Sequence, residues 1–292
     1  MALILVVSAI LAWFLSAPRP LTQAMVPAHQ PDLANGAVMY NIGGCISCHK
    51  PPAGAAGMDP TLPSGGAPLK TPVGTFYPPN LTPDPQTGLG KWSDLDFLNA
   101  MMRGLSPSGA HAIPAFPYTS YTHMRPEDLL DLKAHLASLK PVSTANKPAD
   151  IPLPFLLRRG IGLWQWVGLN TTPWKPDPAQ SESWNRGSYL VNAPGHCSEC
   201  HTPRTFYMAS DMSRFLLGGP HPEGQGRVPS LRDLISRGRY KDVNDLASAL
   251  QYGEIMGYDK LSSGGMRAVQ DNISKLPEPD IKAIAEYLAS LK

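Results

Sequence analysis

The sequence predicts a mostly helical protein in which two tandem domains of similar plan carry long loops rich in proline and glycine. The pattern Cys-x-x-Cys-His occurs twice, beginning at Cys45 and at Cys197, 152 residues apart. Residues 125–140 and 277–292, which close the two halves, match at the same offset and carry apolar residues at helical spacing. The chain also contains 32 prolines and 26 glycines. So many prolines disfavour long helices and an all-strand fold, because proline fixes φ and removes a backbone donor.

The N-terminal segment is apolar, and two interpretations of it stay open. Residues 2–17 read ALILVVSAILAWFLSA and carry no charge, and they fall short of the roughly 20 residues of a full membrane span. Residues 1–20 are therefore predicted to be either a signal segment that is removed or a hydrophobic helix that stays as a membrane anchor. We favour the anchor, so residues 1–17 are expected to contact the membrane.

Each half is predicted to contain the same order of elements: a short helix, the Cys-x-x-Cys-His pattern, a long loop, a middle helix, a ligand-bearing loop and a closing helix. The first domain is placed at 30–142 and the second at 182–292. Residues 143–181, rich in proline and tryptophan, are predicted to form an extended strap. A flexible linker would not carry Trp164, Trp166 and Trp174, so the strap is expected to pack across both domains or to form a docking surface.

The four cysteines of the chain all belong to the two Cys-x-x-Cys-His patterns, namely Cys45, Cys48, Cys197 and Cys200. Two disulfides, a zinc site or a thioredoxin-like motif would also use such pairs. The histidine that directly follows each pair favours haem instead. Two thiols at this spacing meet the two vinyl groups of a haem, and the next imidazole reaches the iron. We therefore predict two covalently bound haem c groups, with His49 and His201 as proximal ligands. This attachment chemistry belongs to the periplasmic side of the bacterial inner membrane, where the chain is expected to lie.

Beyond these motifs, the chain resembles the di-haem cytochromes c related to the cytochrome subunits of membrane-bound bacterial dehydrogenases, including those paired with quinoprotein alcohol dehydrogenases and molybdenum hydroxylases. The stretches that carry the resemblance are TPVGTFY (71–77), PNLTPD (79–84), TGLGKWS (87–93), PAFPY (114–118), WNRGSYLV (184–191), GHC (195–197) and HTPR (201–204). The resemblance implies two cytochrome c domains and an electron-transfer subunit that is not itself an enzyme. It implies a catalytic dehydrogenase subunit as electron donor and a further cytochrome, quinone or oxidase of the respiratory chain as acceptor. The formal net charge of +2, without a basic stripe, gives no sign of a nucleic-acid partner.

The sixth iron ligands are predicted to be methionines from the segment before each closing helix, because a thioether raises the reduction potential and excludes small ligands. In the second half we choose Met266, with Met256 as the runner-up. In the first half the position equivalent to Met266 is Pro114, which cannot ligate. Members of the resembling family carry methionine either where Phe116 stands or at the position of Met124, so Met124 is the choice.

Two histidines are alternatives to Met124 as the sixth ligand of the first haem. His111 or His123 as sixth ligand would give a bis-histidine haem of lower potential, whereas Met101 and Met102 lie on the middle helix and are expected in the core. The resemblance further implies that Asn80, Trp92 and Arg103 hold haem propionates, and that Pro203 and Arg204 pack on the edge of the second haem.

Two alternatives to the electron-transfer subunit stay open. One is a di-haem enzyme of the peroxidase or thiosulfate-oxidising type, which needs one open or weakly ligated iron. The other is the di-haem subunit of a cbb-type oxidase, which also has an N-terminal span and two cytochrome domains. The 152-residue interval and the Trp-rich strap favour the dehydrogenase-linked family.

Overall fold

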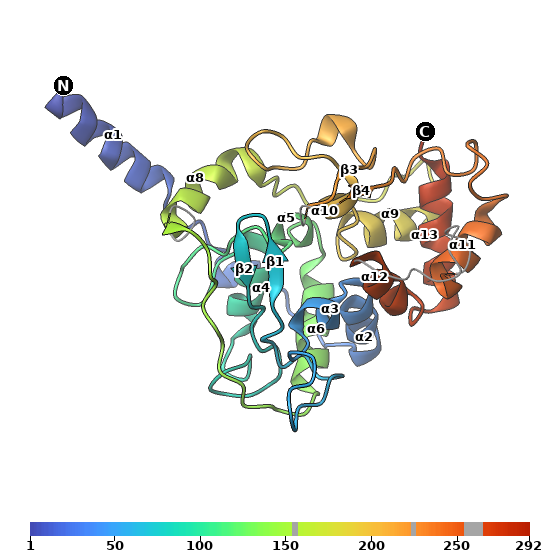
Figure 1. Ribbon diagram of the computed structural model, residues 1–292, viewed down its shortest axis with the longest axis horizontal. Coiled ribbons are helices and arrows are strands. Elements are labelled where there is room, and N and C mark those ends of the chain that lie inside the picture. Colours follow the sequence, from blue (N-terminus) through green and yellow to red (C-terminus); the bar gives the residue numbers. More distant parts are fainter. Residues whose placement is uncertain (154–156, 223–225, 254–264) are drawn as a thin grey trace.

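A computed structural model describes residues 1–153, 157–222, 226–253 and 265–292, and the described chain is mostly helical, as predicted (Figure 1). The first half contains α2 (Leu33–Ile42), α3 (Cys45–His49), α4 (Asp94–Arg103), α5 (Tyr118–Tyr121) and α6 (Pro126–Ala137). The second half contains α9 (Glu182–Asn192), α10 (Ser198–His201), α11 (Val243–Tyr252), α12 (Gly265–Ile273) and α13 (Glu278–Ser290). The order of elements thus recurs in the two halves, whereas the domain boundaries stay a prediction.

The first and last helices of each half pack against each other, α2 on α6 and α9 on α13. A glycine lies at each contact. A Cβ built on Gly36 would lie 2.2 Å from the carbonyl oxygen of Asp131, and one built on Gly187 would lie 1.9 Å from that of Ala283. Only glycine permits such close approach of two backbones, so these residues set how tightly each helix pair closes.

Local capping explains where these helices begin. The side chain of Asp32 accepts from the first amides of α2, and that of Ser181 accepts from the amide of Trp184 at the start of α9. Ser93 and Asp96 form a reciprocal capping box at the start of α4. The closing helices α6 and α13 both start with a proline in the first turn together with acidic side chains, which suit the positive end of a helix.

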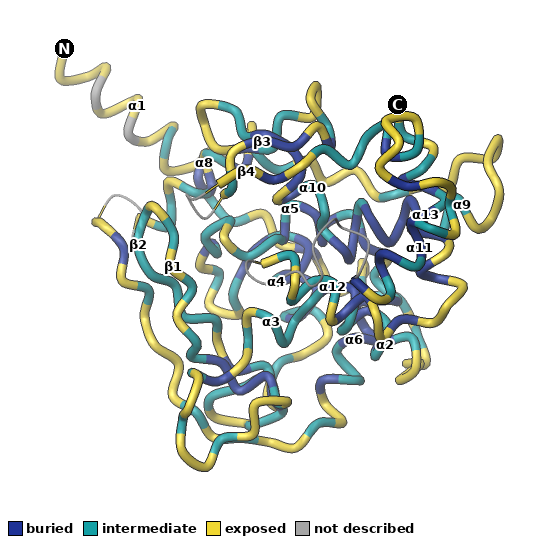
Figure 2. Tube along the Cα trace, turned by 45° about the vertical axis from the view of Figure 1, so that its right-hand side comes forward, coloured by how far each residue is buried: buried dark blue, intermediate teal, exposed yellow. Residues whose placement is uncertain are grey.

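One hydrophobic core runs through both halves. It joins Met39, Leu98 and Leu129 of the first half with Leu190 and Ile284 of the second, all fully or almost fully buried. Figure 2 shows this buried path in dark blue along α6, α9, α11 and α13. The two halves are therefore packed together through apolar side chains and are not joined by the connector alone.

Two small antiparallel hairpins lie in the long loops that follow the Cys-x-x-Cys-His patterns. Strands β1 (Leu69–Thr71) and β2 (Gly74–Phe76) pair in the first half, and β3 (Gly219–Pro220) and β4 (Arg227–Val228) in the second. Two short 3-10 helices, Gln23–Met25 and Met212–Arg214, complete the described elements. The sequence predicts loops here, because strands of two or three residues are too short to show the alternation of apolar and polar residues.

The connector corrects one prediction, since it is not an extended strap throughout. Residues Arg158–Gly168 form α8, which is possible because no proline lies between 155 and 172. The expected packing across both halves is found further along. The backbone amide of Trp174 donates to the carbonyl of His123 (3.3 Å), and the indole ring meets Tyr189 edge-on at 5.1 Å between centroids. This part of the connector therefore contacts both halves.

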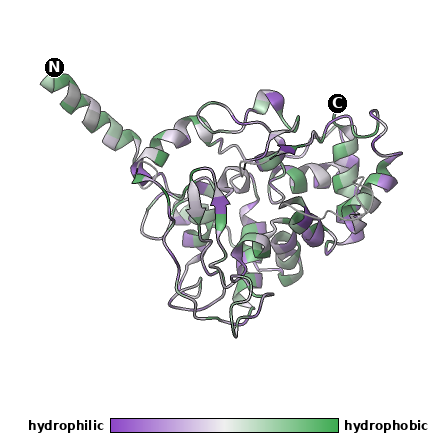
Figure 3. Cartoon of the chain, viewed as in Figure 1, coloured by the Kyte–Doolittle hydropathy of each residue, from purple (hydrophilic) through white to green (hydrophobic). Residues whose placement is uncertain are grey.

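The N-terminal helix α1 (Ala2–Leu15) projects from the body of the molecule (Figure 1). Its ribbon is coloured from green to pale in Figure 3, in keeping with the absence of charged residues from this helix. Within the described ranges, no helix combines the length and the apolar character needed to cross a membrane. The interpretation of α1 as a membrane anchor therefore stays a prediction.

Candidate haem-attachment sites

The first Cys-x-x-Cys-His pattern forms one helical turn, α3, that places His49 beside a backbone carbonyl. Gly44, just before the turn, has φ of +58°, a left-handed conformation that glycine adopts without strain. The ring Nδ1 of His49 lies 2.7 Å from the carbonyl oxygen of Pro79. Because a carbonyl can only accept, Nδ1 carries the proton, and Nε2 keeps the lone pair that an iron ion needs.

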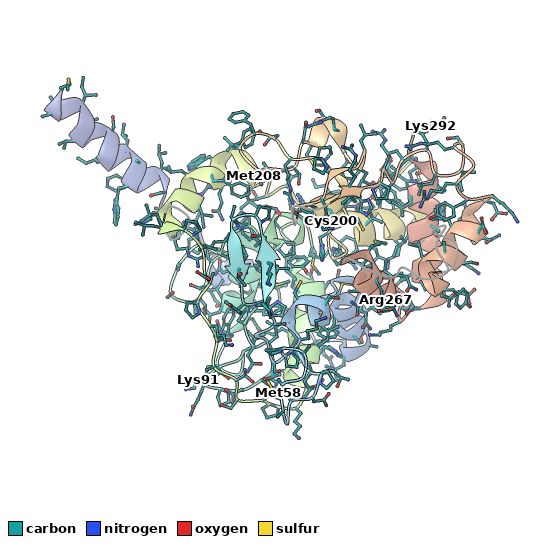
Figure 4. All side chains as sticks on the ribbon, in the orientation of Figure 1. Met58, Lys91, Cys200, Met208, Arg267 and Lys292 are labelled. Atoms are coloured by element: carbon teal, nitrogen blue, oxygen red, sulfur yellow. The ribbon has the colours of Figure 1, made fainter. Side chains whose placement is uncertain are left out.

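The second pattern repeats this geometry. The ring Nδ1 of His201 lies 2.8 Å from the carbonyl oxygen of Pro229. His196, at the position of Gly44, also has positive φ, +40°, although it is not a glycine. Figure 4 labels Cys200 of this turn in the middle of the molecule. Both predicted proximal ligands are thus oriented by the same kind of contact.

Two glycines hold the backbone carbonyls of the histidines themselves and pack against the prolines that orient the imidazoles. The amide of Gly65 donates to the carbonyl of His49 and that of Gly218 donates to the carbonyl of His201, both at 2.7 Å. Both glycines have positive φ, and a Cβ at either would lie 2.6 Å from the carbonyl carbon of Pro79 or Pro229. The orienting role of these four residues was not predicted from the sequence. The signal was a glycine followed by a proline at similar distances after each pattern, which is common in loops of this composition.

The ionisation of the site suits neutral ligands. Burial lowers the pKa of His49 to about 4, outweighing the opposite effect of its bond to Pro79. Burial likewise lowers the pKa of His201, against the opposite effect of Pro229. Burial raises the pKa of Cys45 and of Cys197 to about 12, and the neighbouring cysteine of each pair adds to this. The imidazoles are therefore neutral near pH 7, the form that ligates a metal.

The donor set fits haem c better than the zinc alternative. Each site brings two thiols and one oriented imidazole, which match the two vinyl groups and the iron of a single haem. A structural zinc site needs four ligands of the Cys and His type. Within the described part of the chain, no three His, Cys, Asp or Glu side chains gather in a way that would hold a metal ion.

Met124, the predicted sixth ligand of the first site, follows α5 directly and is 2% exposed. Its backbone amide closes a turn onto the carbonyl of Tyr121 at 2.9 Å. A buried thioether at this place fits both a ligand and a core residue. The alternatives Met101 and Met102 lie on α4 within the hydrophobic core, as expected for packing residues.

The two histidine alternatives are engaged elsewhere. Nε2 of the buried His111 lies 3.1 Å from the carbonyl oxygen of Ser16, while its Nδ1 has no hydrogen-bond partner among the described residues. Nδ1 of His123 lies 2.6 Å from the carbonyl oxygen of Thr172 in the connector. Both rings therefore link the N-terminal segment or the connector to the first half, and the choice of Met124 over these histidines stays a prediction.

In the second half, Met266 is half-buried and lies in the first turn of α12. The prediction that this residue belongs to a loop is therefore wrong, because it is helical. Its assignment as ligand stays a prediction. Met256, the runner-up, lies outside the described residues.

The three predicted propionate partners differ in their surroundings. The buried Asn80 donates to Thr87 (3.0 Å) and to the carbonyl of Val142 (2.6 Å), and its oxygen accepts from Thr82, so its amide already orders the loop. Trp92 is half-buried ahead of α4. Arg103 ends α4, and its pKa is lowered by burial and by the nearby Arg19. An anionic group such as a propionate suits this pair of cations, so Arg103 has the stronger support.

Arg204 of the second half does not reach outward. Its guanidinium bonds Glu199 inside the second Cys-x-x-Cys-His turn, with 2.6 Å between Nη2 and the carboxylate. The predicted packing of Pro203 and Arg204 on a haem edge stays a prediction.

Comparisons with known proteins agree with this geometry. The family model described as cytochrome c matches residues 33–140. A di-haem cytochrome c-type protein of Cereibacter sphaeroides is 39% identical over 99% of this chain and 95% of its own length. The fructose dehydrogenase cytochrome subunit of Gluconobacter japonicus is 30% identical over 94% of this chain, and the cytochrome c subunit of a quinone-dependent alcohol dehydrogenase of Gluconacetobacter polyoxogenes is 34% identical over 88%. The chain spans 55% of the length of each of these two subunits.

The attachment turns and their oriented histidines define a c-type cytochrome, which binds haem c. The chain belongs to the di-haem c-type cytochromes related to the cytochrome subunits of bacterial dehydrogenases. Members of this group are electron-transfer subunits and not the catalytic subunits of their complexes.

Proposed function

We propose that the chain binds two haem c groups and carries electrons from a catalytic dehydrogenase subunit to a downstream cytochrome, quinone or oxidase. One observation carries this proposal above the others: a complete attachment site, with its carbonyl-oriented histidine, is built twice at matching positions. Haem c, when bound, supplies a reversible one-electron change at its iron.

The residues of the chain then have distinct tasks. Cys45 and Cys48 attach one haem, and Cys197 and Cys200 attach the other. His49 and His201 are fixed by Pro79 and Pro229, which makes each imidazole a better electron donor to its metal and prevents its rotation. Met124 and Met266 would each supply a further protein ligand to the bound haem iron. Methionine there favours a raised potential and keeps peroxide and oxygen away, which suits a carrier.

The names of the related proteins support a dehydrogenase as the electron donor. Their names pair the cytochrome subunit with dehydrogenases of alcohols, fructose and gluconate. For this chain we propose a catalytic dehydrogenase subunit of the same kind as electron donor. A tagged holocytochrome is expected to co-purify with such a subunit, and the substrate of that subunit is expected to reduce the haems of the complex. Co-purification with oxidase core subunits would contradict the donor and favour the cbb-type alternative.

A carrier and a di-haem enzyme are separated by their reactivity. With both irons six-coordinate, cyanide or peroxide is expected to leave the optical spectra of the oxidised and half-reduced protein unchanged. A spectral change at one haem would contradict the carrier, because it requires an open or weakly held sixth position.

We propose further that the protein works on the periplasmic side of the inner membrane and attaches to it through α1 and neighbouring residues. Trp166 of α8, more than half exposed, donates its indole N–H to the carbonyl of Leu15 at 2.8 Å. Arg159 lies over Trp13 and Arg19 over Trp166, at 4.0 and 4.2 Å from the ring centroids. Met208, labelled near α8 in Figure 4, adds an exposed apolar side chain. Tryptophan with arginine beside an apolar helix supports contact with lipid headgroups.

Fractionation of cells tests this attachment. The full chain is expected in the membrane fraction after a high-salt wash, and a chain lacking residues 1–17 behind a replaced export signal is expected in the soluble periplasm. Recovery of the full chain in the soluble fraction would contradict the proposal.

A further inference from the structure

The third residue of each attachment pattern points into the other half of the molecule. These residues are Ser47 in the first pattern and Glu199 in the second, and they occupy equivalent positions 152 residues apart. The amide Nδ2 of Asn272 donates to the hydroxyl of Ser47 at 2.7 Å. The hydroxyls of Thr119 and Ser120 donate to one carboxylate oxygen of Glu199, at 2.5 and 2.9 Å. Each attachment turn is thus held by side chains of the opposite half.

The partners come from corresponding places. Asn272 lies on α12, the helix that begins beside Met266. Thr119 and Ser120 lie on α5, which leads directly to Met124. In each half, therefore, the segment that carries the proposed sixth ligand also binds the attachment turn of the other half. Figure 1 shows α5 beside α10 and α12 beside α3.

A third contact between the two halves accompanies those of Ser47 and Glu199. The carbonyl oxygen of Gly43 accepts from the phenol of Tyr121 (3.3 Å) and from Nε2 of His196 (3.2 Å). The rings of Tyr121 and His196 meet edge-on, with centroids 5.6 Å apart. His196 keeps its left-handed backbone, which is unfavourable for a side chain with a Cβ, and backbone strain of this kind persists where surrounding contacts enforce it.

The carboxylate of Glu199 is buried and fully engaged. The side chain is 11% exposed, and its second oxygen pairs with Arg204 at 2.6 Å. A buried carboxylate is costly unless it is paired and hydrogen-bonded, and here both conditions are met by residues from two halves. The contact therefore fixes the position of the second attachment turn against α5 more strongly than a surface ion pair would.

We propose that these three contacts form a clasp that holds the two attachment turns together, so that the two haems exchange electrons directly within one chain. The clasp comprises Ser47 with Asn272, Glu199 with Thr119 and Ser120, and Gly43 with Tyr121 and His196. In the exchange, one electron leaves one iron and enters the other, and no bond or proton moves. Ser47, Glu199 and their partners are positioning residues, because they act through the turns that carry the thioether bonds. This inference rests on the proposed binding of two haems.

The test is the rate at which an electron equilibrates between the two haems after flash photoreduction of the purified holoprotein. In Thr119→Val and in Asn272→Ala this rate is expected to fall several-fold, because the two attachment turns move apart and electron transfer slows as the distance between the haems grows. Thr119→Ser, which keeps the hydroxyl, is expected to restore the wild-type rate. The rate is expected to be independent of protein concentration.

Redox titration supplies a readout that loss of packing alone would not move. Glu199→Gln removes one buried negative charge and is expected to raise the midpoint potential of the haem on Cys197 and Cys200, because a nearby anion stabilises the oxidised iron. The matched control is Asp211→Asn, which also breaks a carboxylate–arginine pair, with Arg214 at 2.7 Å, but on the exposed surface. That control is expected to change neither the potential nor the exchange rate.

Two results separate the inference from the function on which it rests. Fewer than two haems per wild-type chain would overturn the proposed function. Two haems with wild-type ligation, together with unchanged exchange rates in Thr119→Val and Asn272→Ala, would overturn the clasp alone. An exchange rate proportional to protein concentration would also overturn it, because electrons would then pass between molecules.

Discussion

At the scale of single residues, each proposed proximal histidine is fixed by the backbone rather than by other side chains. The carbonyl of Pro79 or Pro229 holds the imidazole ring of each histidine. The amide of a glycine holds the backbone carbonyl of the same histidine. Backbone groups hold their place even when neighbouring side chains change. The identity of the sixth ligand, by contrast, depends on one side chain, so it is the part of each site that substitution tests best.

Met124→Leu tests the first sixth ligand. Leucine fills nearly the same volume, so the free energy of unfolding is expected to change by less than about 1.5 kcal/mol. The near-infrared band of Met–iron ligation is expected to fall by half, and the potential of one haem is expected to drop. Met102→Leu, in the buried core of α4, is the control and is expected to leave the band intact. An unchanged band in Met124→Leu would show that another residue ligates.

Asp131 gives a pH dependence whose sign is fixed by its contacts. Burial raises the pKa of this carboxyl, but hydrogen bonds from Asn35, from the amide of Asp32 and from His29 outweigh burial and lower it below its ordinary value. The ionised form therefore stabilises the fold above the ordinary pKa of aspartate. This contribution is lost as the pH falls through the lowered pKa of the folded state.

The variant Asp131→Asn measures this contribution. Near neutral pH it is expected to lower the free energy of unfolding by about 1–3 kcal/mol, because asparagine cannot accept all of these bonds. The difference from wild type is expected to shrink as the pH falls below about 4, where the carboxyl of the unfolded chain becomes protonated, and to be lost below the lowered pKa of the folded state. Denaturant titrations of both proteins at a series of pH values give the comparison, and a difference that grows toward acid pH would refute the assigned sign.

At the scale of elements, the sequence predicted the helices well and the short irregular pieces poorly. The closing helices α6 and α13 have long apolar periodicity and clear proline and acidic starts, so their positions follow from local physics. The helix α8 was hidden because a Pro-rich stretch surrounds it, and α12 because glycines precede Met266. In both cases tertiary contacts, and not local preference, decide the conformation.

Gly187→Ala tests the closest helix contact. A methyl group at this position would lie 1.9 Å from the carbonyl oxygen of Ala283, so α9 and α13 must separate, at an expected cost of about 1–3 kcal/mol in the free energy of unfolding. Gly160→Ala in α8 is the matched control, since among the described residues no atom outside the local helix backbone and the chain neighbours lies within 4 Å of the added Cβ. There alanine is expected to stabilise by up to about 1 kcal/mol through its higher helix propensity. Equal effects of the two substitutions in denaturant titrations would contradict the tight contact.

At the scale of the whole molecule, the two halves act as one packed body. Besides the clasp and the common core, the phenol of the buried Tyr189 in α9 donates to the carboxylate of Asp128 in α6. The same phenol oxygen accepts from the amide of Arg125 at 3.1 Å. Sequence repeats indicate that two similar units exist, but they carry no information on how the units face each other. For that reason the contacts between the halves were not predicted.

Tyr189→Phe measures one of these contacts. It leaves the buried carboxylate of Asp128 with one donor fewer, and the free energy of unfolding is expected to fall by about 1–3 kcal/mol. Tyr252→Phe is the control. Its ring is 63% exposed, so an effect below about 0.5 kcal/mol is expected. A negligible effect of Tyr189→Phe on denaturant unfolding would mean that this bond adds little to the contact between the halves.

Some parts of the attachment sites could be predicted from the sequence and others could not. Cysteine and histidine spacing gave both haem motifs directly, because the chemistry requires consecutive residues. The orienting carbonyls of Pro79 and Pro229 lie about 30 residues further along the chain, and only the folded loop brings them near. The partners of Glu199 are more distant still, since they come from the other half of the molecule.

We propose above all a carrier with two haems, each ligated by a histidine and a methionine. The decisive measurement is low-temperature EPR of the oxidised protein, combined with a haem count and a near-infrared spectrum. The account predicts two haems per chain, two low-spin signals and a Met–iron band of matching intensity. A single haem, a high-spin signal or a bis-histidine signal would contradict it.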